Sequence, residues 1–241
     1  MIMRSGGRTY RLRALTDLWT GDLNGKSDRL ITTGLLGSIR WWFEVLVRGL
    51  YGNACDPTDT KCEDRNHCVV CELFGCTGWA RKFRFQVLDE NGDTKTDQII
   101  KGKTFSLRFT PLRPICDEEW TLLDATLRLI VGYGAIGGKT VLKPTDEDSR
   151  KGKLHHQDYG LVQMTTSREF AETRRDDLKE YLSKWRKLNH GKFTWASLQH
   201  FWCVNGKYLG REDNNSSTFN RVLGRREAKN QGQFLATSND E

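Results

Sequence analysis

No apolar run in this sequence is long enough to span a membrane, because none approaches the roughly eighteen successive residues that a transmembrane helix needs. The first residues, MIMRSGGRTYRLRAL, also lack the apolar stretch and the small-residue cleavage site of a secretory signal peptide. We therefore expect neither a membrane-spanning segment nor a signal peptide, and we expect the protein to reside in the cytoplasm.

The sequence also lacks a recognisable catalytic constellation. Two of its five histidines, His155 and His156, are adjacent and lie in a charged stretch with little apolar content. No Ser/His/Asp set and no pair of acid–base carboxylates can be assembled from the spacing. Such a histidine pair is more typical of a protein surface, and a histidine that cleaves RNA is the alternative.

A glycine-rich segment, Gly132 to Thr140, resembles a phosphate-binding loop without matching it. In the pattern GxxxxGK[ST] with Lys139 as the lysine, Tyr133 stands where the first glycine belongs. The segment also follows a helical pattern, whereas that loop follows a strand and opens a helix. Nucleotide hydrolysis is therefore disfavoured. Either the glycines let backbone N–H groups approach a phosphate, or they form a plain turn.

Charge is present in excess of one sign, but it is unevenly distributed. The chain has 241 residues, of which 37% are hydrophobic and 29% are charged, and its net charge is +7. This is the profile of a soluble globular protein, and the positive excess permits a polyanionic partner without proving one. Residues 51–100 carry 6 bases against 9 acids, and they hold five of the seven cysteines. An inserted loop with its own chemistry is therefore expected there.

The cysteine pattern of this loop predicts a structural zinc site. Cys68 and Cys71 form a CxxC pair, and Cys62 and Cys55 precede Cys68 by six and thirteen residues. Zinc takes four tetrahedral ligands in structural sites, and a CxxC turn supplies two thiolates at a suitable separation. His67 or Cys76 could replace either upstream ligand. The alternative is a set of reduced thiols without metal, and a redox CxxC is disfavoured because no thioredoxin-like context surrounds it.

Hydrophobic periodicity predicts a mixed α+β fold. Alternating patterns predict three strands, and 3.6-residue patterns predict two helices. A further strand is expected near Val141 or Leu161. The expected elements are strands at 9–15, 83–87 and 105–109 and helices at 33–50 and 117–131. Their βαββαβ order is that of a ferredoxin-like (RRM-like) domain.

We expect a domain over residues 1–150 that carries the cysteine-rich insertion at about 52–78. A second, smaller and degenerate α+β domain is expected over 151–241. It would contain a long basic helix at 168–188 and a polar, partly disordered tail from residue 211.

The segment Thr32–Trp42 holds the features of an anion site at a helix start. Thr32 or Thr33 is a suitable N-cap, and the N–H groups that follow are available to a phosphate. Farther along the same helix, Arg40, Glu44 and Arg48 are spaced as i,i+4 charge pairs, whose simplest explanation is a solvated face.

Three segments in this order resemble the RAMP superfamily of type III CRISPR effector complexes. The segment TGLLGSIRWWFEVLVRG at 33–49 resembles the superfamily's signature helix, and CELFGCTGWARKF at 71–83 resembles its segment leading into a strand. The third, at 132–140, occupies the place of the superfamily's glycine-rich loop but lacks its arginines.

The resemblance implies a non-catalytic RNA-binding subunit of a type III-B complex, which helps to hold guide or target RNA together with other subunits. It would contact phosphates and stack bases. The candidate RNA-binding residues are Lys26, Arg29, Thr32, Thr33, Arg40, Trp41, Arg48, Trp79, Arg81, Lys82, Gly134, Gly137, Gly138 and Lys139. The alternatives are a metal-independent RNA endonuclease that uses His155 or His156, and a purely structural subunit.

Overall fold

The computed structural model describes residues 6–22, 24, 26–55, 62–137, 159–165, 173–187, 196–203 and 220–222. The main elements in chain order are β1 (Arg8–Ala14), α1 (Thr32–Gly49), α2 (Val69–Phe74), β2 (Phe83–Leu88), β3 (Thr104–Pro111), α3 (Asp117–Tyr133), β4 (Val162–Met164) and α4 (Arg175–Ser183). They are followed by a short 3-10 helix, η3 (Leu198–His200), and by the strands β5 (Phe201–Cys203) and β6 (Asn220–Val222). The predicted α+β composition is confirmed.

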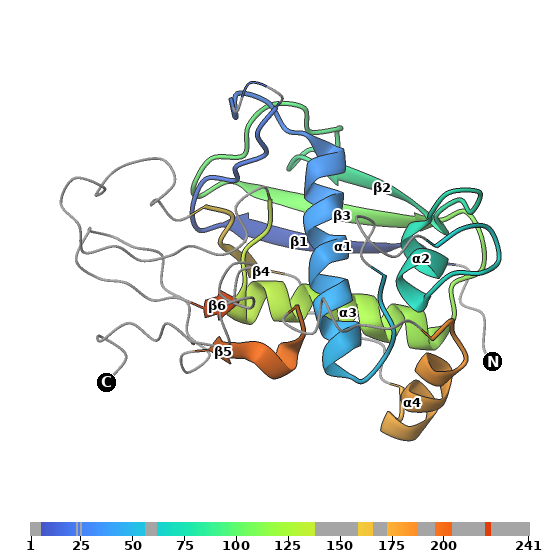
Figure 1. The fold of residues 1–241 in the computed structure, drawn as a ribbon. Coiled ribbons are helices and arrows are strands. Elements are labelled where there is room, and N and C mark those ends of the chain that lie inside the picture. Colours follow the sequence, from blue (N-terminus) through green and yellow to red (C-terminus); the bar gives the residue numbers. More distant parts are fainter. Residues whose placement is uncertain are drawn as a thin grey trace.

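Four strands form one antiparallel sheet in the order β2-β3-β1-β4. α1 follows β1 and α3 follows β3, so these six elements have the predicted order, and α2 is an addition to it. In Figure 1, α1 crosses in front of the sheet and α3 passes beside the lower half of α1. The fourth strand starts at Val162, next to the predicted position at Leu161, whereas Val141 lies outside the described residues.

The alternating patterns of the strands place one face of the sheet in the core. β1 alternates strictly between buried and exposed residues, with Tyr10 and Leu12 on the buried side. α1 and α3 bury Trp42 and Trp120 completely against this face. Aromatic rings from three strands pack edge to face or tilted in the same layer, Phe83 against Phe109 among them. The core therefore lies on one side of the sheet, between the strands and the two long helices.

The cysteine-bearing insertion is part of this core and contains a short helix, α2, that the sequence patterns did not predict. α2 begins directly after Cys68, and all six of its residues are buried. Phe74 contacts Phe43 of α1 and Phe83 of β2 edge to face, at ring-centroid distances of 5.2 and 5.5 Å. The helix was not predicted because six residues are too few to produce a periodic pattern in the sequence.

Two expectations for the C-terminal part differ from the structure. The helix predicted at 168–188 is the shorter α4, and its nine residues carry two bases against three acids, so it is not basic. Asn220–Val222, in the predicted tail, form β6 and pair with β5. Among the described residues, none of the helices combines the length and apolar character that a membrane span requires.

The predicted boundary at residue 150 would cut through the four-stranded sheet, because its fourth strand, β4, lies at Val162–Met164. The sheet is therefore completed by residues beyond that boundary. Most of the region 151–241 lies outside the described residues.

Candidate metal centre and nucleic-acid interface

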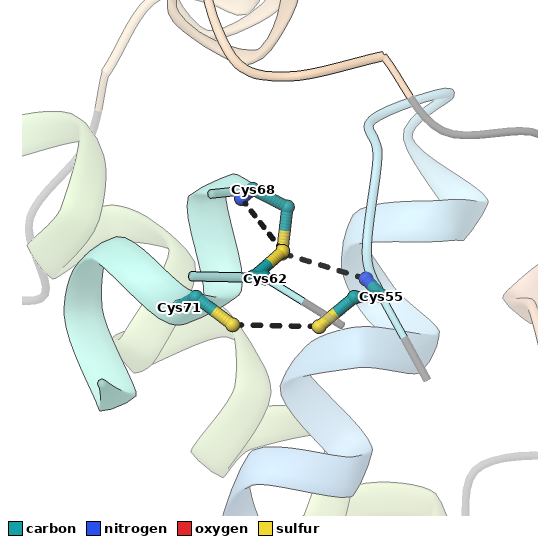
Figure 2. Close-up of side chains that lie close together, drawn as sticks. All are labelled: Cys55, Cys62, Cys68 and Cys71. Atoms are coloured by element: carbon teal, nitrogen blue, oxygen red, sulfur yellow. Dashed lines mark hydrogen bonds between the residues drawn. The ribbon is translucent and has the colours of Figure 1, made fainter. Parts of the chain in front are cut away.

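The four cysteines predicted as ligands converge on one point. Their Sγ atoms all lie within 4.8 Å of one another, and all four residues are buried. Cys55 lies in the segment after α1, Cys62 and Cys68 precede α2, and Cys71 lies on α2. Figure 2 shows the thiols turned toward each other from these separate segments. The spacing of the cysteines in the sequence is thus converted by the fold into a compact tetrathiol cluster.

This cluster has the dimensions of a zinc tetrathiolate and not of disulfides. The Sγ atoms of Cys55 and Cys71 are 3.4 Å apart, far from the roughly 2.05 Å of an S–S bond. Four sulfurs at about 2.3 Å from a tetrahedral zinc ion would be about 3.8 Å from each other. Backbone N–H groups also point at sulfurs, from Cys55 to Cys68 at 3.4 Å and from Cys68 to Cys62 at 3.3 Å. Such bonds are typical of thiolates held on short turns.

Neither residue considered as a substitute ligand joins the cluster. Both ring nitrogens of His67 have other partners: Nδ1 lies against the carbonyl of Asp64, and Nε2 lies 2.7 Å from the Glu72 carboxylate. Cys76 is only half-buried and is not among the four clustered thiols. The structure therefore favours the ligand set Cys55, Cys62, Cys68 and Cys71.

Two arginines approach the cluster from outside. Arg40 of α1 points Nη2 at Cys71 Sγ, 3.3 Å away, and at Cys55 Sγ, 3.9 Å away. Arg186, which follows α4, places Nη1 3.9 Å from Cys62 Sγ. Burial acts to lower the pKa of Arg40, but Glu44 and Cys71 raise it above its ordinary value, so the guanidinium stays charged. Positive groups around metal-bound thiolates are a common way to balance their charge. Sequence reasoning missed these contacts with the thiols for both arginines.

The charged residues of α1 do not form the solvated face that their spacing predicted. Glu44 and Arg48 are buried, and Glu44 accepts a 3.0 Å hydrogen bond from Arg40 Nε. Burial raises the pKa of Glu44 to about 7, against the lowering effect of both arginines. Arg48 donates to the carbonyls of Ala54, Cys55 and Ala196. Because its guanidinium is inside the molecule, Arg48 is not positioned to contact RNA.

Lys82 is likewise engaged within the protein. Its ammonium lies 2.7 Å from Glu119 of α3 and also contacts Glu72 of α2. Glu119 additionally accepts a 2.9 Å hydrogen bond from the hydroxyl of Tyr181 on α4. The lysine predicted to contact phosphate, which lies just before β2, instead joins α2 to α3 and, through Glu119, to α4.

The start of α1 is open, but its cap differs from the prediction. The helix begins at Thr32 with Ile31 as N-cap, and no side chain caps it. The hydroxyl of Thr20 instead accepts a 3.0 Å bond from the N–H of Ile31. Because Thr33, Gly34 and Gly37 are exposed, the first turns of the helix present small residues at the surface.

The glycine loop packs against α1 instead of facing outward. Gly134 and Gly137 are buried, and their N–H groups donate to Ile130 and to the hydroxyl of Ser38. A Cβ on Gly134 would lie 2.5 Å from the Trp42 ring, and one on Gly137, which has a φ of +118°, would lie 2.6 Å from the Trp19 carbonyl oxygen. The described part of this loop therefore matches the plain-turn interpretation. Gly138 and Lys139 lie outside the described residues, as do His155 and His156.

The remaining predicted RNA contacts are at least partly accessible. Lys26, Arg29 and Arg81 are exposed. Trp41 is half-buried and packs edge to face on Trp42 at 5.0 Å. Trp79 is half-buried too, and its ring is contacted by His67 and by the Arg113 guanidinium. The accessible candidates thus include the residues around the α1 start and Arg81.

Comparison with known proteins finds a match to one protein-family model and similarity to several solved structures. The family model of the RAMP superfamily matches residues 11–142. No curated protein matches the chain. Similar solved structures include Cmr1 from Pyrococcus furiosus, with 13% identity over 68% of this chain and 50% of that one, at a TM-score of 0.43.

Two further structures are similar at comparable levels. One is a type III-B Cmr-beta complex bound to cognate target RNA, at 12% identity and a TM-score of 0.39 over 76% of this chain and 60% of that one. The other is a Csm3-Csm4 subcomplex of the type III-A CRISPR-Cas interference complex, at 14% identity and a TM-score of 0.33 over 76% of this chain and 98% of that one. The chain spans half the length of the Cmr1 structure. Since the 132 residues matched by the family model are more than half of the 241-residue chain, the protein belongs to the RAMP superfamily.

Proposed function

We propose that this protein is a non-catalytic RNA-binding subunit of a type III-B CRISPR effector complex, acting in the cytoplasm together with other subunits of that complex. The proposal rests on its membership of the RAMP superfamily and on the resemblance of residues 33–49 to the superfamily's signature helix. The strand order β2-β3-β1-β4, with one helix after β1 and one after β3, supports assigning a ferredoxin-like class to the first domain. We place the end of this domain near Thr165, with a second, smaller domain after it.

The observation that carries the RNA-binding proposal is the open start of α1. N–H groups at the beginning of a helix favour anions, and glycines let a phosphate approach the backbone closely. Thr33, Gly34 and Gly37 are exposed there, and Trp41 lies one turn beyond Gly37 on the same side of the helix. Lys26 and Arg29 are exposed in the segment that leads into the helix. These groups would hold phosphates, and Trp41 would offer a ring for a base.

Gly37 provides a direct test, because a side chain at this position meets nothing within 4 Å. Gly37→Glu would place a negative charge on the α1 start, and we expect it to weaken binding of single-stranded RNA by about 10-fold or more. Ser183→Glu, at an exposed position at the end of α4, adds the same charge away from the α1 start and is the control. Filter binding over a salt series is the measurement. A wild-type protein that binds no RNA, or whose affinity ignores salt, would contradict the proposal.

We further propose that Cys55, Cys62, Cys68 and Cys71 hold a structural zinc ion. Four thiolates would fill the tetrahedral coordination, leaving no open position for chemistry. The ion would join the segment after α1 to the start of α2, two pieces of chain separated by residues 56–61. Zinc analysis of the purified protein should give about one ion per chain. Cys68→Ser should abolish it, whereas Cys76→Ser, outside the cluster, should not.

The absence of nuclease activity is also part of the proposal. Purified protein incubated with repeat RNA should leave the RNA intact. Cleavage that disappears when His155 and His156 are changed to Ala would instead establish the endonuclease alternative.

A further inference from the structure

The face of the four-stranded sheet that is turned away from the core is open and strongly basic. In antiparallel strands, directly paired residues point to the same side of the sheet. Pairing therefore identifies this face, which consists of Thr9, Arg11, Arg13, Arg84, Gln86, Leu88, Thr104, Ser106, Arg108, Thr110 and Gln163. All of these residues except Leu88 are exposed or half-buried, and all four arginines are exposed.

The register places the arginines on a continuous line across three strands. Arg84 of β2 pairs with Thr110, so it lies diagonally beside Arg108 of β3. Arg108 pairs with Thr9 and therefore lies diagonally beside Arg11 of β1. Arg13 continues the line along β1. Diagonal and next-but-one neighbours in a sheet are about 7–8 Å apart, a step comparable to the separation of successive phosphates in an extended single strand.

Within the four strands of the sheet, no acidic residue lies between these arginines. The four described strands contain no aspartate or glutamate at all. Asp89 and Glu90 belong to the turn that follows β2, and Glu90 accepts a 3.3 Å hydrogen bond from the N–H of Thr104, at the Arg13 end of the face. The positions between the arginines are occupied mainly by hydroxyl and amide side chains, which also bind phosphate oxygens. A face of this composition is complementary to a polyanion.

The open face also differs from a base-stacking platform. The aromatic residues of these strands, among them Tyr10, Phe85 and Phe109, are all buried on the opposite side. Because no aromatic ring of the strands is exposed on this face, it is suited to the backbone of a nucleic acid more than to its bases. Binding would therefore depend little on sequence and strongly on salt.

We propose that the arginine line Arg84–Arg108–Arg11–Arg13 is a binding track for the phosphate backbone of single-stranded RNA. This inference rests on the proposed RNA-binding function and adds a second surface to it. The track lies on the sheet, away from α1, whose open start is the other proposed contact. Together, the two surfaces would hold an extended strand at more than one point.

The test uses the full chain and a fluorescein-labelled oligouridine, with affinity measured by anisotropy over a salt series. The variant R11Q/R84Q/R108Q removes one charge from each strand. We expect it to weaken binding by about 10-fold or more at low salt. Its slope of log affinity against log salt should be shallower by about 2, since each phosphate contact on a single strand contributes about 0.7. R65Q removes an equally exposed arginine from the cysteine insertion and should behave as wild type.

Replacement of the same three arginines by lysine separates charge from folding. We expect R11K/R84K/R108K to retain most of the affinity, because a phosphate contact needs the charge more than the guanidinium shape. Glutamine and lysine variants that lose binding equally would overturn the proposal, as would a glutamine variant with the wild-type slope. Neither result would contradict the separate proposal that RNA binds at the start of α1. If the wild-type chain binds no RNA, the proposed function itself fails.

Discussion

At the scale of single residues, Arg40 shows how tertiary contacts give a charged side chain a role that its position in the sequence did not predict. Its spacing from Glu44 on α1 predicted a surface pair, and the resemblance made it an RNA contact. In the structure it bonds Glu44, the carbonyl of Gly75 and the thiols of Cys71 and Cys55. A zinc ion with four thiolates carries a charge of −2, and buried charge needs compensation. Arg40 and Arg186 supply two positive charges at the sulfurs.

Arg40→Gln is therefore expected to speed the transfer of zinc to a chromogenic chelator by about 10-fold or more, the usual cost of losing an outer partner of a metal ligand. Arg65→Gln, which removes an exposed charge in the same insertion, should leave the transfer rate unchanged. The visible spectrum of the cobalt-substituted protein is a second readout of the site. Equal transfer rates in both variants would show that Arg40 does not support the metal.

Gly137 and Gly37 lie in two of the resembling segments, yet they are expected to respond to alanine in opposite directions. Gly137 has a positive φ and packs on the Trp19 carbonyl, so Gly137→Ala should lower the free energy of unfolding by more than about 1 kcal/mol. Gly37 is helical with open space around it, so Gly37→Ala should raise that free energy by about 0.5–1 kcal/mol. Urea unfolding of the two variants measures both changes. Destabilisation by Gly37→Ala would contradict the open start of α1.

At the scale of elements, a buried ionic cluster joins the first strand to the third helix. Arg8 and Tyr10 of β1 both bond the carboxylate of Asp124 on α3, and the Arg8 guanidinium lies 4.3 Å from the centre of the Trp120 ring. Arg8 and Asp124 are only 3% and 2% exposed. Burial, followed by the charge of Asp124, raises the pKa of Tyr10 well above its ordinary range, so the phenol stays a donor. Removing any one of these three side chains would leave a buried polar or charged partner without its hydrogen bond, which would lower the free energy of unfolding.

Asp124→Ala should consequently lower the free energy of unfolding by about 3–5 kcal/mol, because it leaves the Arg8 charge buried without a carboxylate. Denaturant unfolding monitored by circular dichroism is the measurement. Asp28→Ala, at an exposed position, is the control and should change stability by less than about 0.5 kcal/mol. A loss below about 1 kcal/mol for Asp124→Ala would mean that the cluster relaxes easily.

At the scale of the whole molecule, the cysteine cluster lies where three parts of the chain meet. It joins the segment after α1, the insertion with α2, and residues 173–187. The Trp185 ring lies 5.7 Å from the His67 ring, and Arg186 donates to the carbonyl of Asn66. Arg48, one turn beyond Glu44 on α1, holds the carbonyls of Ala54 and Ala196. A metal at this point would therefore organise contacts far beyond its ligands.

Removal of the metal should loosen these parts together. We expect a chelator under reducing conditions to increase amide hydrogen exchange in residues 62–74 and 173–187, while β1 and β3 keep their protection. Hydrogen exchange followed by mass spectrometry resolves these segments. The same treatment of the Cys68→Ser variant should have no further effect. Exchange that rises only in the insertion would restrict the role of the metal to that insertion.

Patterns along the chain were sufficient to predict the strands β1, β2 and β3, the helices α1 and α3, and the four cysteines of the cluster. Alternation and helical periodicity are local signals, because burial of one face is the main force that selects them. The CxxC spacing is also a local signal. It correctly predicted that the four cysteines lie together, although α2 was not predicted. The bounds predicted for the helix at 168–188 were wrong, because a broad stripe of apolar residues does not show where a helix begins and ends.

Which charged groups face the solvent depends on contacts between elements, and these became visible only in the folded molecule. Arg40, Arg48 and Lys82 have long side chains that reach partners on other elements, and no pattern along one element reveals those partners. The arginines of the open sheet face are the converse case. Their alternation was visible in each strand, but their alignment into one line depends on the pairing register between strands. Register arises from contacts between residues distant in the chain, and therefore from the folded molecule.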